Sequence, residues 1–519
     1  MRLEGLRKRK QDGRFGAVAI LAAIDIGTNA IRLVISDVDA GLNPRIIHLV
    51  REPVRLGQEV FTQGSISEET IGRAVDAFRR FGDLIGTAGV THTKAVATSA
   101  VREAQNRDIF IDRVLQASGI ETEVINAQEE ARLIHLAVSR QVDFRNRTAM
   151  LVDIGGGSVE VTIATQNNIL LADSYKMGSV RLLQILDEHT LGEKRFNQMV
   201  VEYVDATHRR MKKEIGKQKI GLFVGTGGSI ESMGILRQQV YGKNSGARLT
   251  AGELAQMVSD LESMTTGERI EKLKLRPDRA DVIVPATIVL HAMVERAGVS
   301  EVLIPGIGLK DGVLLDLATQ VFEGPLLPED QVVSSAMQLG KKFGFDRPHA
   351  SAVARFATQI FDQTGSLHNL GRENRLLLQV AALLHDIGYF LNVSGHHKHS
   401  FYLLTASPLV GLTPPQAAVV ANVARYHRGS FPRAQHEHYR VLPARDRVTV
   451  SKLAGILRLA DALDYEHAGK VHDVEVLVDS REVTLRLRGE GDLMLEKWAL
   501  AKKADLFESV FPAKIKVDS

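Results

Sequence analysis

The chain is 519 residues long, carries a formal net charge of +3 and contains no cysteine. Its length exceeds what one hydrophobic core supports and predicts roughly three or four structural units. The lack of cysteine excludes disulfides, thiolate zinc sites and a cysteine nucleophile, and the small net charge gives no overall field for nucleic acid. No apolar run reaches the roughly 18 residues that cross a bilayer. We therefore expect a cytoplasmic protein without a nucleic-acid or membrane partner.

The N-terminus is predicted to be a basic tail, residues 1–19, followed by a strand. The basic "MRLEGLRKRKQDGR" and the apolar "FGAVAILAAI" together have the arrangement of a secretory signal. The apolar run continues directly into "DIGTNAIRL", however. This continuity favours a buried first strand over a signal peptide.

Two segments share one pattern of strand, tight turn and strand. "AIDIGTNAIRLVI" aligns without gaps with "LVDIGGGSVEVTI", so that Asp25 matches Asp153 and Arg32 matches Glu160. Apolar runs on either side of a turn of small residues are typical of a β-hairpin. The repeat predicts a duplicated domain whose two glycine turns face each other across a cleft.

The order of the remaining elements predicts an α/β half followed by a helical half. Helix and strand patterns alternate through residues 66–140, and "LFVGTGGSIESMGIL" adds a strand, a glycine turn and a helix. "FEGPLLPEDQ", residues 322–331, has the composition of a linker. We expect duplicated α/β subdomains at 20–140 and 141–325, an all-α domain at 326–468 and a small α+β unit at 469–519.

The glycine turns are candidate phosphate sites, because glycine lets backbone N–H groups approach an anion. Three such turns follow apolar strands: "DIGTN", "DIGGGS" and "GTGGS", which includes Gly227 and Gly228. Asp153 and Glu160 then fit a phosphate chain that carries Mg²⁺, a cation that carboxylate oxygens hold. The alternative is that Asp153 caps a turn and Glu160 is merely exposed.

Glu130 is the candidate general base. Asn126 and Glu129 have the spacing of a helix N-terminal capping box. Glu130 instead begins an apolar stripe that continues through Leu133 and Ile134, so its carboxylate should point along the buried face. There it could take a proton from a water that attacks a terminal phosphate. A capping or ion-paired glutamate remains the alternative.

These motifs, in order, resemble the exopolyphosphatase / guanosine pentaphosphate phosphohydrolase family. The matching segments are "AIDIGTNAIRLVI", "ATSAVREAQN", "NAQEEARLI", "VDIGGGSVE", "GTGGSI" and "DRADVI". The resemblance implies an actin-like (ribonuclease H-like) fold, shared with sugar kinases and heat-shock ATPases. It also implies a homodimer that removes terminal phosphate processively from inorganic polyphosphate with Mg²⁺ or Mn²⁺.

The resemblance assigns roles to individual residues. Glu130 matches the catalytic glutamate, and Asp153 and Glu160 match the other acidic catalytic or metal-associated positions. The phosphate-binding positions are matched by Asn29, Arg102, Gly155, Gly156, Gly157 and Ser158. The first loop departs from the usual "DIGSNS", because Thr28 and Ala30 replace both serines. Ala30 lacks a hydroxyl, which puts one phosphate or metal contact in doubt.

The helical half carries a second candidate site. His349, the pair His385-Asp386, and Asp461 each lie on a predicted helix with an apolar face, and histidine with carboxylate in a helical bundle suits a divalent metal. This H…HD…D order resembles the HD phosphohydrolase superfamily. A second metal could use His396, His397, His399 and His427, unless these contact polyphosphate instead. The alternative for the first four is a set of satisfied core residues.

The leading hypothesis is therefore an exopolyphosphatase, a phosphoric anhydride hydrolase that uses Glu130 as general base. The sequence does not separate polyphosphate from guanosine pentaphosphate as the preferred substrate. The alternatives are an actin-like kinase or a nucleotide- or polyphosphate-sensing module, in either case with a separate metal-dependent phosphohydrolase site in the helical half.

Overall fold

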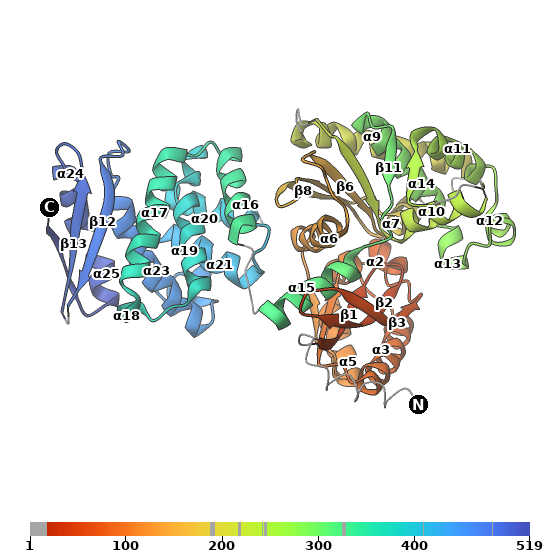
Figure 1. The fold of residues 1–519 in the computed structure, drawn as a ribbon, viewed down its shortest axis with the longest axis horizontal. Coiled ribbons are helices and arrows are strands. Elements are labelled where there is room, and N and C mark those ends of the chain that lie inside the picture. Colours follow the sequence, from red (N-terminus) through yellow and green to blue (C-terminus); the bar gives the residue numbers. More distant parts are fainter. Residues whose placement is uncertain are drawn as a thin grey trace. The chain divides into compact units, whose positions relative to one another are not determined.

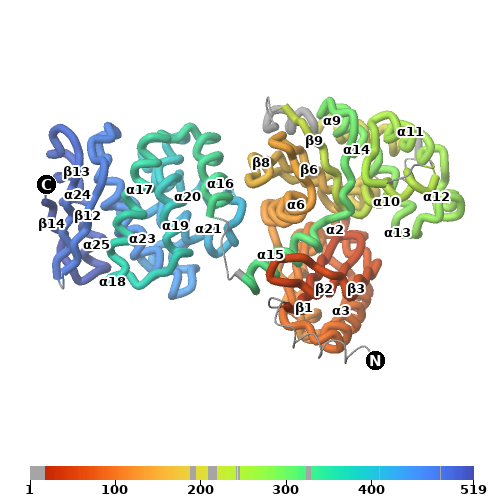
Figure 2. Tube along the Cα trace, viewed as in Figure 1, coloured from red at the N-terminus to blue at the C-terminus, as the bar shows by residue number. Residues whose placement is uncertain are grey.

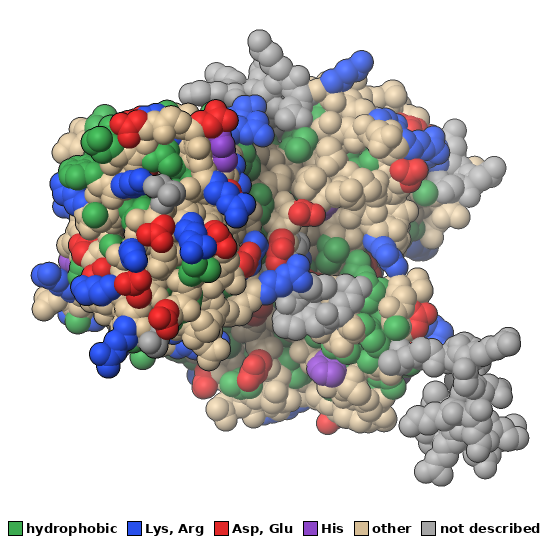
Figure 3. All heavy atoms as spheres, turned by 60° about the vertical axis from the view of Figure 1, so that its left-hand side comes forward, with side chains coloured by type: hydrophobic (Ala, Val, Ile, Leu, Met, Phe, Trp, Pro, Cys, Tyr) green, Lys and Arg blue, Asp and Glu red, His purple; other side chains and the backbone are tan. Residues whose placement is uncertain are grey.

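The computed structural model describes residues 18–186, 193–215, 219–240, 242, 246–323, 329–407, 409–479 and 481–518. The chain forms two compact units, residues 1–326 and 327–519 (Figure 1). Most of the expected basic tail, and residues 324–328 of the expected linker, lie outside the described part. On the face shown in Figure 3, Lys and Arg side chains are interspersed with Asp and Glu side chains.

The first half of the first unit is built on a five-stranded sheet with the order β3-β2-β1-β4-β5. β1 pairs antiparallel with β2 and parallel with β4. The strands are β1 Val18–Ile26, β2 Ile31–Asp39, β3 Pro44–Glu52, β4 His92–Ala97 and β5 Thr122–Val124. The helices are α2 Gly57–Gln63, α3 Glu68–Ala88, α4 Ser99–Glu103, α5 Arg107–Ser118 and α6 Ala127–Gln141. The expected first strand is confirmed, and residues 21–26 of it are buried.

The second half of this unit repeats the arrangement. Its sheet has the order β8-β7-β6-β9-β11-β10, which is the first sheet's order with one strand added at the edge. The strands are β6 Ala149–Ile154, β7 Val159–Ala164, β8 Ile169–Tyr175, β9 Leu222–Thr226, β10 Arg248–Thr250 and β11 Glu301–Leu303. The helices are α7 Ser179–Leu186, α9 Glu193–Ile215, α10 Gly228–Gln239, α11 Ala251–Glu262, α12 Thr266–Leu273, α13 Pro277–Ala280, α14 Ile283–Ala297 and α15 Leu309–Glu323.

The two predicted hairpins are confirmed and have the same local geometry. β1 pairs with β2 so that Asp25 faces Arg32, and β6 pairs with β7 so that Asp153 faces Glu160. The turns match as well: the Gly27 N–H donates to the Ala30 carbonyl at 3.2 Å, and the Gly155 N–H donates to the Ser158 carbonyl at 3.1 Å. The duplication thus brings two equivalent glycine turns to equivalent sheet positions.

Each sheet is held by its own apolar core. In the first half, Phe78 and Phe81 of α3 pack with the buried side chains of β1 and β2, among them Ile24 and Leu33. In the second half, β6, β7 and β9 pack with α10, α11 and α14. Helix α15 returns to the first half and packs on α6 and β1, which Figure 2 lets the reader follow along the chain. In the part of the chain that the structure describes, no helix combines the length and apolar character needed to cross a membrane.

The second unit is a helical bundle with a three-stranded sheet of order β12-β13-β14. Its helices are α16 Glu329–Lys342, α17 Arg347–Gln363, α18 Gly365–His368, α19 Arg372–Leu384, η1 Ile387–Phe390, α20 His396–Ala406, α21 Pro414–Arg425, α22 Glu437–Arg440, α23 Ala444–Ala462, α24 Met494–Lys503 and α25 Asp505–Val510. Its strands are β12 Val471–Val478, β13 Glu482–Gly489 and β14 Lys514–Asp518. Val474, Leu485 and Phe507 lie in the same apolar core as the helices, so helices and sheet share one interior.

Candidate functional site

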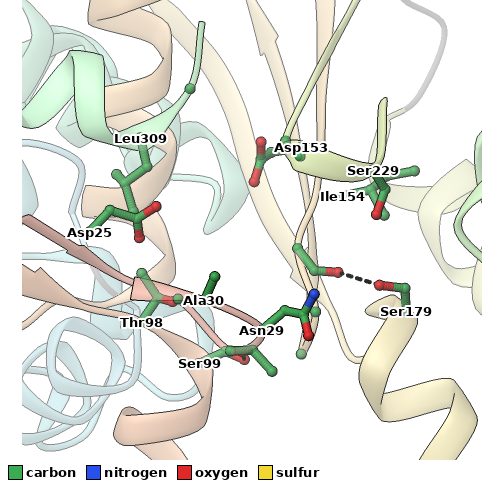
Figure 4. A pocket seen from close by; sticks show the side chains of 18 of the residues that line it. Asp25, Asn29, Ala30, Thr98, Ser99, Asp153, Ile154, Ser179, Ser229 and Leu309 are labelled. Atoms are coloured by element: carbon green, nitrogen blue, oxygen red, sulfur yellow. Dashed lines mark hydrogen bonds between the residues drawn. The ribbon is translucent and has the colours of Figure 1, made fainter. Parts of the chain in front are cut away.

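A cleft of about 750 Å³ in the first unit is lined by all three glycine turns. In Figure 4, Asp25, Asn29 and Ala30 lie on one side of it, and Asp153 and Ser229 lie on the other. Glu130 also lines the cleft, from the first turn of α6. The sequence-predicted residues Asn29, Gly155, Gly156, Gly157, Ser158, Gly227 and Gly228 are all among the lining residues.

The second glycine turn presents N–H groups to the cleft. Its carbonyl oxygens are occupied: the Gly155 carbonyl accepts from the Ser179 N–H at 3.1 Å, and the Arg181 backbone N–H and Nε donate to the carbonyls of Gly156 and Gly157 at 2.9 and 2.6 Å. Within the described residues, the N–H groups of Gly156 and Gly157 have no acceptor. Donors without acceptors, beside carbonyls that are turned away and paired, suit an anion.

The first turn is arranged in the same way. The Thr28 carbonyl accepts from the Gly57 N–H at 2.9 Å, and the Asn29 carbonyl accepts from the Arg55 N–H at 3.2 Å. The Asn29 side chain donates to the Asp278 carbonyl at 2.8 Å, so its amide already bridges the two halves of the unit. The side-chain amide nitrogen of Asn29 is therefore occupied by the Asp278 carbonyl, and it could contact a phosphate only after exchanging that contact.

The two turns approach each other so closely that glycine is required. A Cβ at Gly156 would lie 2.9 Å from the Thr28 side chain, and a Cβ at Gly157 would lie 1.9 Å from Ser99 Oγ. Both distances are shorter than real Cβ contacts, so even an alanine would force the two walls of the cleft apart.

Two arginines that the sequence reasoning did not assign as ligands flank the third turn. A Cβ at Gly228 would lie 2.8 Å from Nη2 of Arg32 and 2.8 Å from Nη2 of Arg279. Burial, followed by the charge of Arg32, lowers the pKa of Arg279 to about 10. Arg279 is buried, whereas Arg32 is partly buried and already paired with Asp25. An anion beside the start of α10 would offset the positive charge of Arg279. Arg279 belongs to "DRADVI", one of the segments that carry the family resemblance. The spacing of residues in this segment does not indicate which side chain would reach the cleft.

Glu130, Asp153 and Glu160 converge, with one carboxylate oxygen of each within 4.8 Å of the others. Asp153 Oδ1 accepts from Thr226 Oγ1 at 2.6 Å, and Glu160 Oε1 accepts from Ser158 Oγ at 2.6 Å. The alternative of an exposed Glu160 is wrong, because the residue is only 2% exposed. The structure thus brings together the three acids that the sequence singled out.

The cluster is short of positive charge. Burial, and then the charge of Glu160, raises the pKa of Glu130 well above its usual range and that of Asp153 to about 7. Within the described residues, Glu160 Oε2 is buried without a hydrogen-bond partner. A hard divalent cation would satisfy this oxygen and offset the charge, so the donor set fits Mg²⁺ or Mn²⁺.

Arg102 lies behind the cleft rather than on its lining. Its Nη1 donates to the Ile125 carbonyl at 2.7 Å and lies 3.4 Å from Glu130 Oε2. Among the described residues, this long contact is the one ion pair of Glu130. Asn126 accepts from the Glu129 N–H at 2.8 Å, as a cap should, while the Glu129 carboxylate contacts Arg132 instead of returning to the cap. Of these two neighbouring glutamates, Glu130 is the one that lines the cleft.

The four predicted metal ligands of the helical unit also converge. His349 Nε2 lies 3.8 Å from Asp386 Oδ2 and 3.8 Å from Asp461 Oδ1, and His385 Nε2 lies 3.4 and 3.8 Å from the same two oxygens. Burial lowers the pKa of His385, but the two carboxylates outweigh it and raise the pKa to about 9. The carboxylates of this cluster, like those of the cleft, therefore favour a positively charged group beside them.

The additional histidines divide into two pairs. His396 Nε2 and His427 Nε2 lie 3.1 and 3.5 Å from Asp386 Oδ1, and 3.2 Å from each other. His397 and His399 are half-buried and belong to none of the metal-competent groups found in the described residues. Spacing alone could not separate His396 from His397 and His399 in α20, or pair it with His427, which follows α21.

Comparison with known proteins gives matches along both units. The model of the "Ppx/GppA phosphatase family" matches residues 34–321, and that of "Ppx/GppA phosphatase, domain III" matches residues 333–507. The chain is 31% identical over 322 residues to Exopolyphosphatase 2 of Mycobacterium tuberculosis, covering 58% of this chain and 99% of the relative. It is 23% identical over 476 residues to guanosine-5'-triphosphate,3'-diphosphate pyrophosphatase of Vibrio parahaemolyticus, covering 91% and 92%.

Two solved structures resemble the first unit. An exopolyphosphatase from Cytophaga hutchinsonii is 27% identical, with a TM-score of 0.54, and covers 58% of this chain and 97% of its own. The Aquifex aeolicus member of the Ppx/GppA family is 25% identical, with a TM-score of 0.51, and covers 60% and 100%. The expected actin-like fold of the duplicated half is thereby confirmed.

Proposed function

The chain belongs to the Ppx/GppA phosphatase family, and we propose that it is an exopolyphosphatase that hydrolyses the terminal phosphate of inorganic polyphosphate, with guanosine pentaphosphate as a second substrate. One observation carries the proposal: two buried carboxylates, Glu130 and Glu160, meet the half-buried Asp153 at a cleft lined by glycine turns. The N–H groups that would bind phosphate thus lie close to the acids that would bind a cation and activate water. The relatives named above are phosphoric anhydride hydrolases by name.

In the proposed mechanism, the glycine turns hold the last phosphates of the chain, and Arg32 and Arg279 balance their charge beside Gly228. Glu130, whose pKa burial and the charge of Glu160 raise well above its usual range, takes a proton from the attacking water. The water oxygen bonds to the terminal phosphorus as the bond to the bridging oxygen breaks, and the proton ends on a released phosphate.

Asp153 and Glu160 would hold Mg²⁺ or Mn²⁺ in this scheme. When bound, the cation supplies charge stabilisation for the phosphate oxygens. Arg102 acts through Glu130 and not on the phosphate directly. Its guanidinium lies 3.4 Å from the Glu130 carboxylate and orients it. In the second unit, His349, His385, Asp386 and Asp461 would hold a divalent metal in an HD-type domain. A cytoplasmic homodimer completes the proposal.

A kinase or a sensing module is less well supported. A kinase acceptor would need to displace the water beside Glu130, whereas a buried carboxylate with a raised pKa suits a hydrolytic base. A sensor would bind the phosphate chain without needing that base.

Phosphate release from long-chain polyphosphate and from guanosine pentaphosphate, with gel analysis of chain length, tests the proposal. We expect phosphate release that requires Mg²⁺ or Mn²⁺, with full-length chains and short end products but few intermediates. Tight binding of either substrate without phosphate release would refute the hydrolase, and transfer of phosphate from ATP to an acceptor would favour the kinase.

A further inference from the structure

Helix α4 contacts both the base and the second half of the first unit, through neighbouring side chains. Its first residue, Ser99, lines the cleft, as Figure 4 shows. Near its end, Arg102 Nη1 lies 3.4 Å from Glu130 Oε2. The next residue, Glu103, accepts a hydrogen bond from Arg181 of the second half. Two consecutive side chains thus connect this short helix to the base and to the opposite half of the unit.

Arg181 joins α4 to the second glycine turn. Its Nη2 donates to Glu103 Oε1 at 2.6 Å, its Nε donates to the Gly157 carbonyl at 2.6 Å, and its backbone N–H donates to the carbonyl of the preceding glycine at 2.9 Å. In a planar trans peptide the N–H points away from the carbonyl, so a bond to the carbonyl also directs the N–H of the following residue. The N–H groups of Gly157 and Ser158 are directed in this way.

The Arg181 side chain is buried and is also held by an aromatic ring. It is 6% exposed, and its guanidinium carbon lies 3.8 Å from the centre of the Phe61 ring in α2, which belongs to the first half. A buried cation is costly unless it is paired, and a planar guanidinium suits a carboxylate and a ring face at the same time. Arg181 is therefore fixed relative to the first half as well as to the glycine turn.

Glu103 is charged across the neutral pH range. Burial raises the pKa of its carboxyl, but the hydrogen bond and the charge of Arg181 outweigh burial and hold the pKa below its usual range. Lys176 Nζ also lies 3.2 Å from Glu103 Oε2, but this lysine side chain is 69% exposed, and an exposed ion pair contributes little. Arg181 is thus the partner that fixes the carboxylate.

Neither member of this pair is placed to touch phosphate. The side chains that line the cleft include Ser99 and Glu130, but neither Glu103 nor Arg181. The pair reaches the reaction only through the residues that it holds, which are the second glycine turn and α4. This distinguishes it from a ligand of the phosphate chain.

We propose that Glu103 and Arg181 form a positioning pair, which sets the distance between the second glycine turn and Glu130 and thereby aligns the terminal phosphate with the attacking water. The inference deepens the proposed function and rests on it. The turn and the base belong to different halves of the unit, so contacts between the halves determine their relative position. An in-line displacement depends on that position, because the water, the phosphorus and the leaving oxygen must lie in line.

The pair is tested by phosphate release from long-chain polyphosphate, at a temperature well below the Tm of every variant. Arg181→Lys and Glu103→Gln should each lower kcat about 10- to 100-fold and change KM less than about twofold, because alignment is lost while the glycine turn is retained. If the two residues act as one pair, the double variant should be no slower than the slower single variant.

Two controls separate positioning from the general loss of an ion pair. Arg237→Lys disrupts a pair with Glu253 of 2.9 Å that is similarly shielded but lies outside the cleft lining. Lys176→Ala removes the exposed partner of the same Glu103 carboxylate. Both variants should retain the kcat of wild type.

Chemical rescue gives a readout that a purely structural role would not produce. Ethylguanidinium supplies the atoms that Arg181→Ala removes beyond Cβ, and it should raise the kcat of this variant about tenfold, since it restores the lost alignment. Ethylammonium at the same concentration should not. Guanidinium compounds weaken folding, so the recovery cannot come from stabilisation of the fold. If Arg181→Ala does not fold, Arg181→Lys and Glu103→Gln decide the matter.

Three results would overturn the pair: a kcat close to wild type in Arg181→Lys and Glu103→Gln, a loss that appears in KM alone, or no rescue of a folded Arg181→Ala. A loss in KM alone would make the pair a determinant of phosphate binding. Failure of the proposed function looks different, because wild type itself would then release no phosphate from polyphosphate, and the inference would fall with it.

Discussion

Asp153 faces Glu160 across the β6–β7 hairpin at the register position where Asp25 faces Arg32 across β1–β2. In the first hairpin the pair is a salt bridge of 2.9 Å. In the second hairpin, two acids face each other, and neither has a basic partner across the hairpin. The duplicated scaffold thus carries one neutral and one acidic wall, and the acidic wall is where Glu130 points. This asymmetry supports the cation proposed for the cleft and has consequences for stability.

Mg²⁺ should stabilise the protein more at alkaline than at acidic pH. The pKa of Asp153 is raised to about 7 and that of Glu130 well above its usual range. The metal-free folded state therefore holds protons that the unfolded chain has released, and its stability, complete at low pH, is lost as pH rises through about 7. Mg²⁺ binds the deprotonated acids and restores it.

Thermal unfolding with and without Mg²⁺, at about pH 5.5 and about pH 8, measures this effect. The increase in Tm should be larger at the higher pH, by about 2–4 °C for each kcal/mol of binding. Asp153→Asn should reduce the difference. Equal increases at both pH values would mean that the acids do not hold the ion.

Gly156→Ala should damage activity through geometry alone. The new Cβ would lie 2.9 Å from Thr28 and 3.0 Å from Val180, so the two glycine turns must separate. A displacement of about 1 Å costs on the order of 100-fold in kcat/KM, because phosphate and base lose their alignment. Gly72→Ala, in a helix with open space around it, is the control and should be neutral in a polyphosphate assay. Normal activity of Gly156→Ala would show that the turns need not approach each other.

Ala30→Ser should improve phosphate binding in the first turn. Ala30 lines the cleft and is 1% exposed, and the resemblance places a serine hydroxyl there. One added hydrogen bond contributes about 0.5–1.5 kcal/mol, so KM for polyphosphate should fall roughly two- to tenfold. Ala30→Val adds volume without a donor and should raise KM. A higher KM for the serine variant would place the phosphate path elsewhere.

Arg102→Ala should shift the pH profile of hydrolysis. Burial and the charge of Glu160 raise the pKa of Glu130, and Arg102 lowers it. Without the arginine the base binds its proton more tightly, so the acidic limb of kcat/KM should move to higher pH, by about one unit. Arg107→Ala, which removes an exposed arginine paired with Asp108, should leave the profile in place. A shift to lower pH would contradict the proposed contact.

The predictions from sequence succeed where the direction of a side chain follows from the helical period of apolar residues or from the pairing register of two strands. The two hairpins are set by apolar alternation around glycine, and the inward direction of Glu130 follows from its helical stripe through Leu133 and Ile134. Sequence reasoning did not separate His396 from His397, because helix packing decides which neighbour faces Asp386. It also did not assign Arg279 to a phosphate, since only the folding of α13 brings it beside Gly228. Both depend on contacts between segments far apart in the chain.

The most direct test of the cleft chemistry compares Glu130→Gln with Glu129→Gln in phosphate release from long-chain polyphosphate. Both changes remove one charge from the first turn of α6, but only Glu130 faces the cleft, whereas Glu129 pairs with Arg132. Loss of a general base should lower kcat for Glu130→Gln by about 100- to 10,000-fold with little change in KM, while Glu129→Gln stays close to wild type. Near-wild-type kcat in Glu130→Gln would contradict the account.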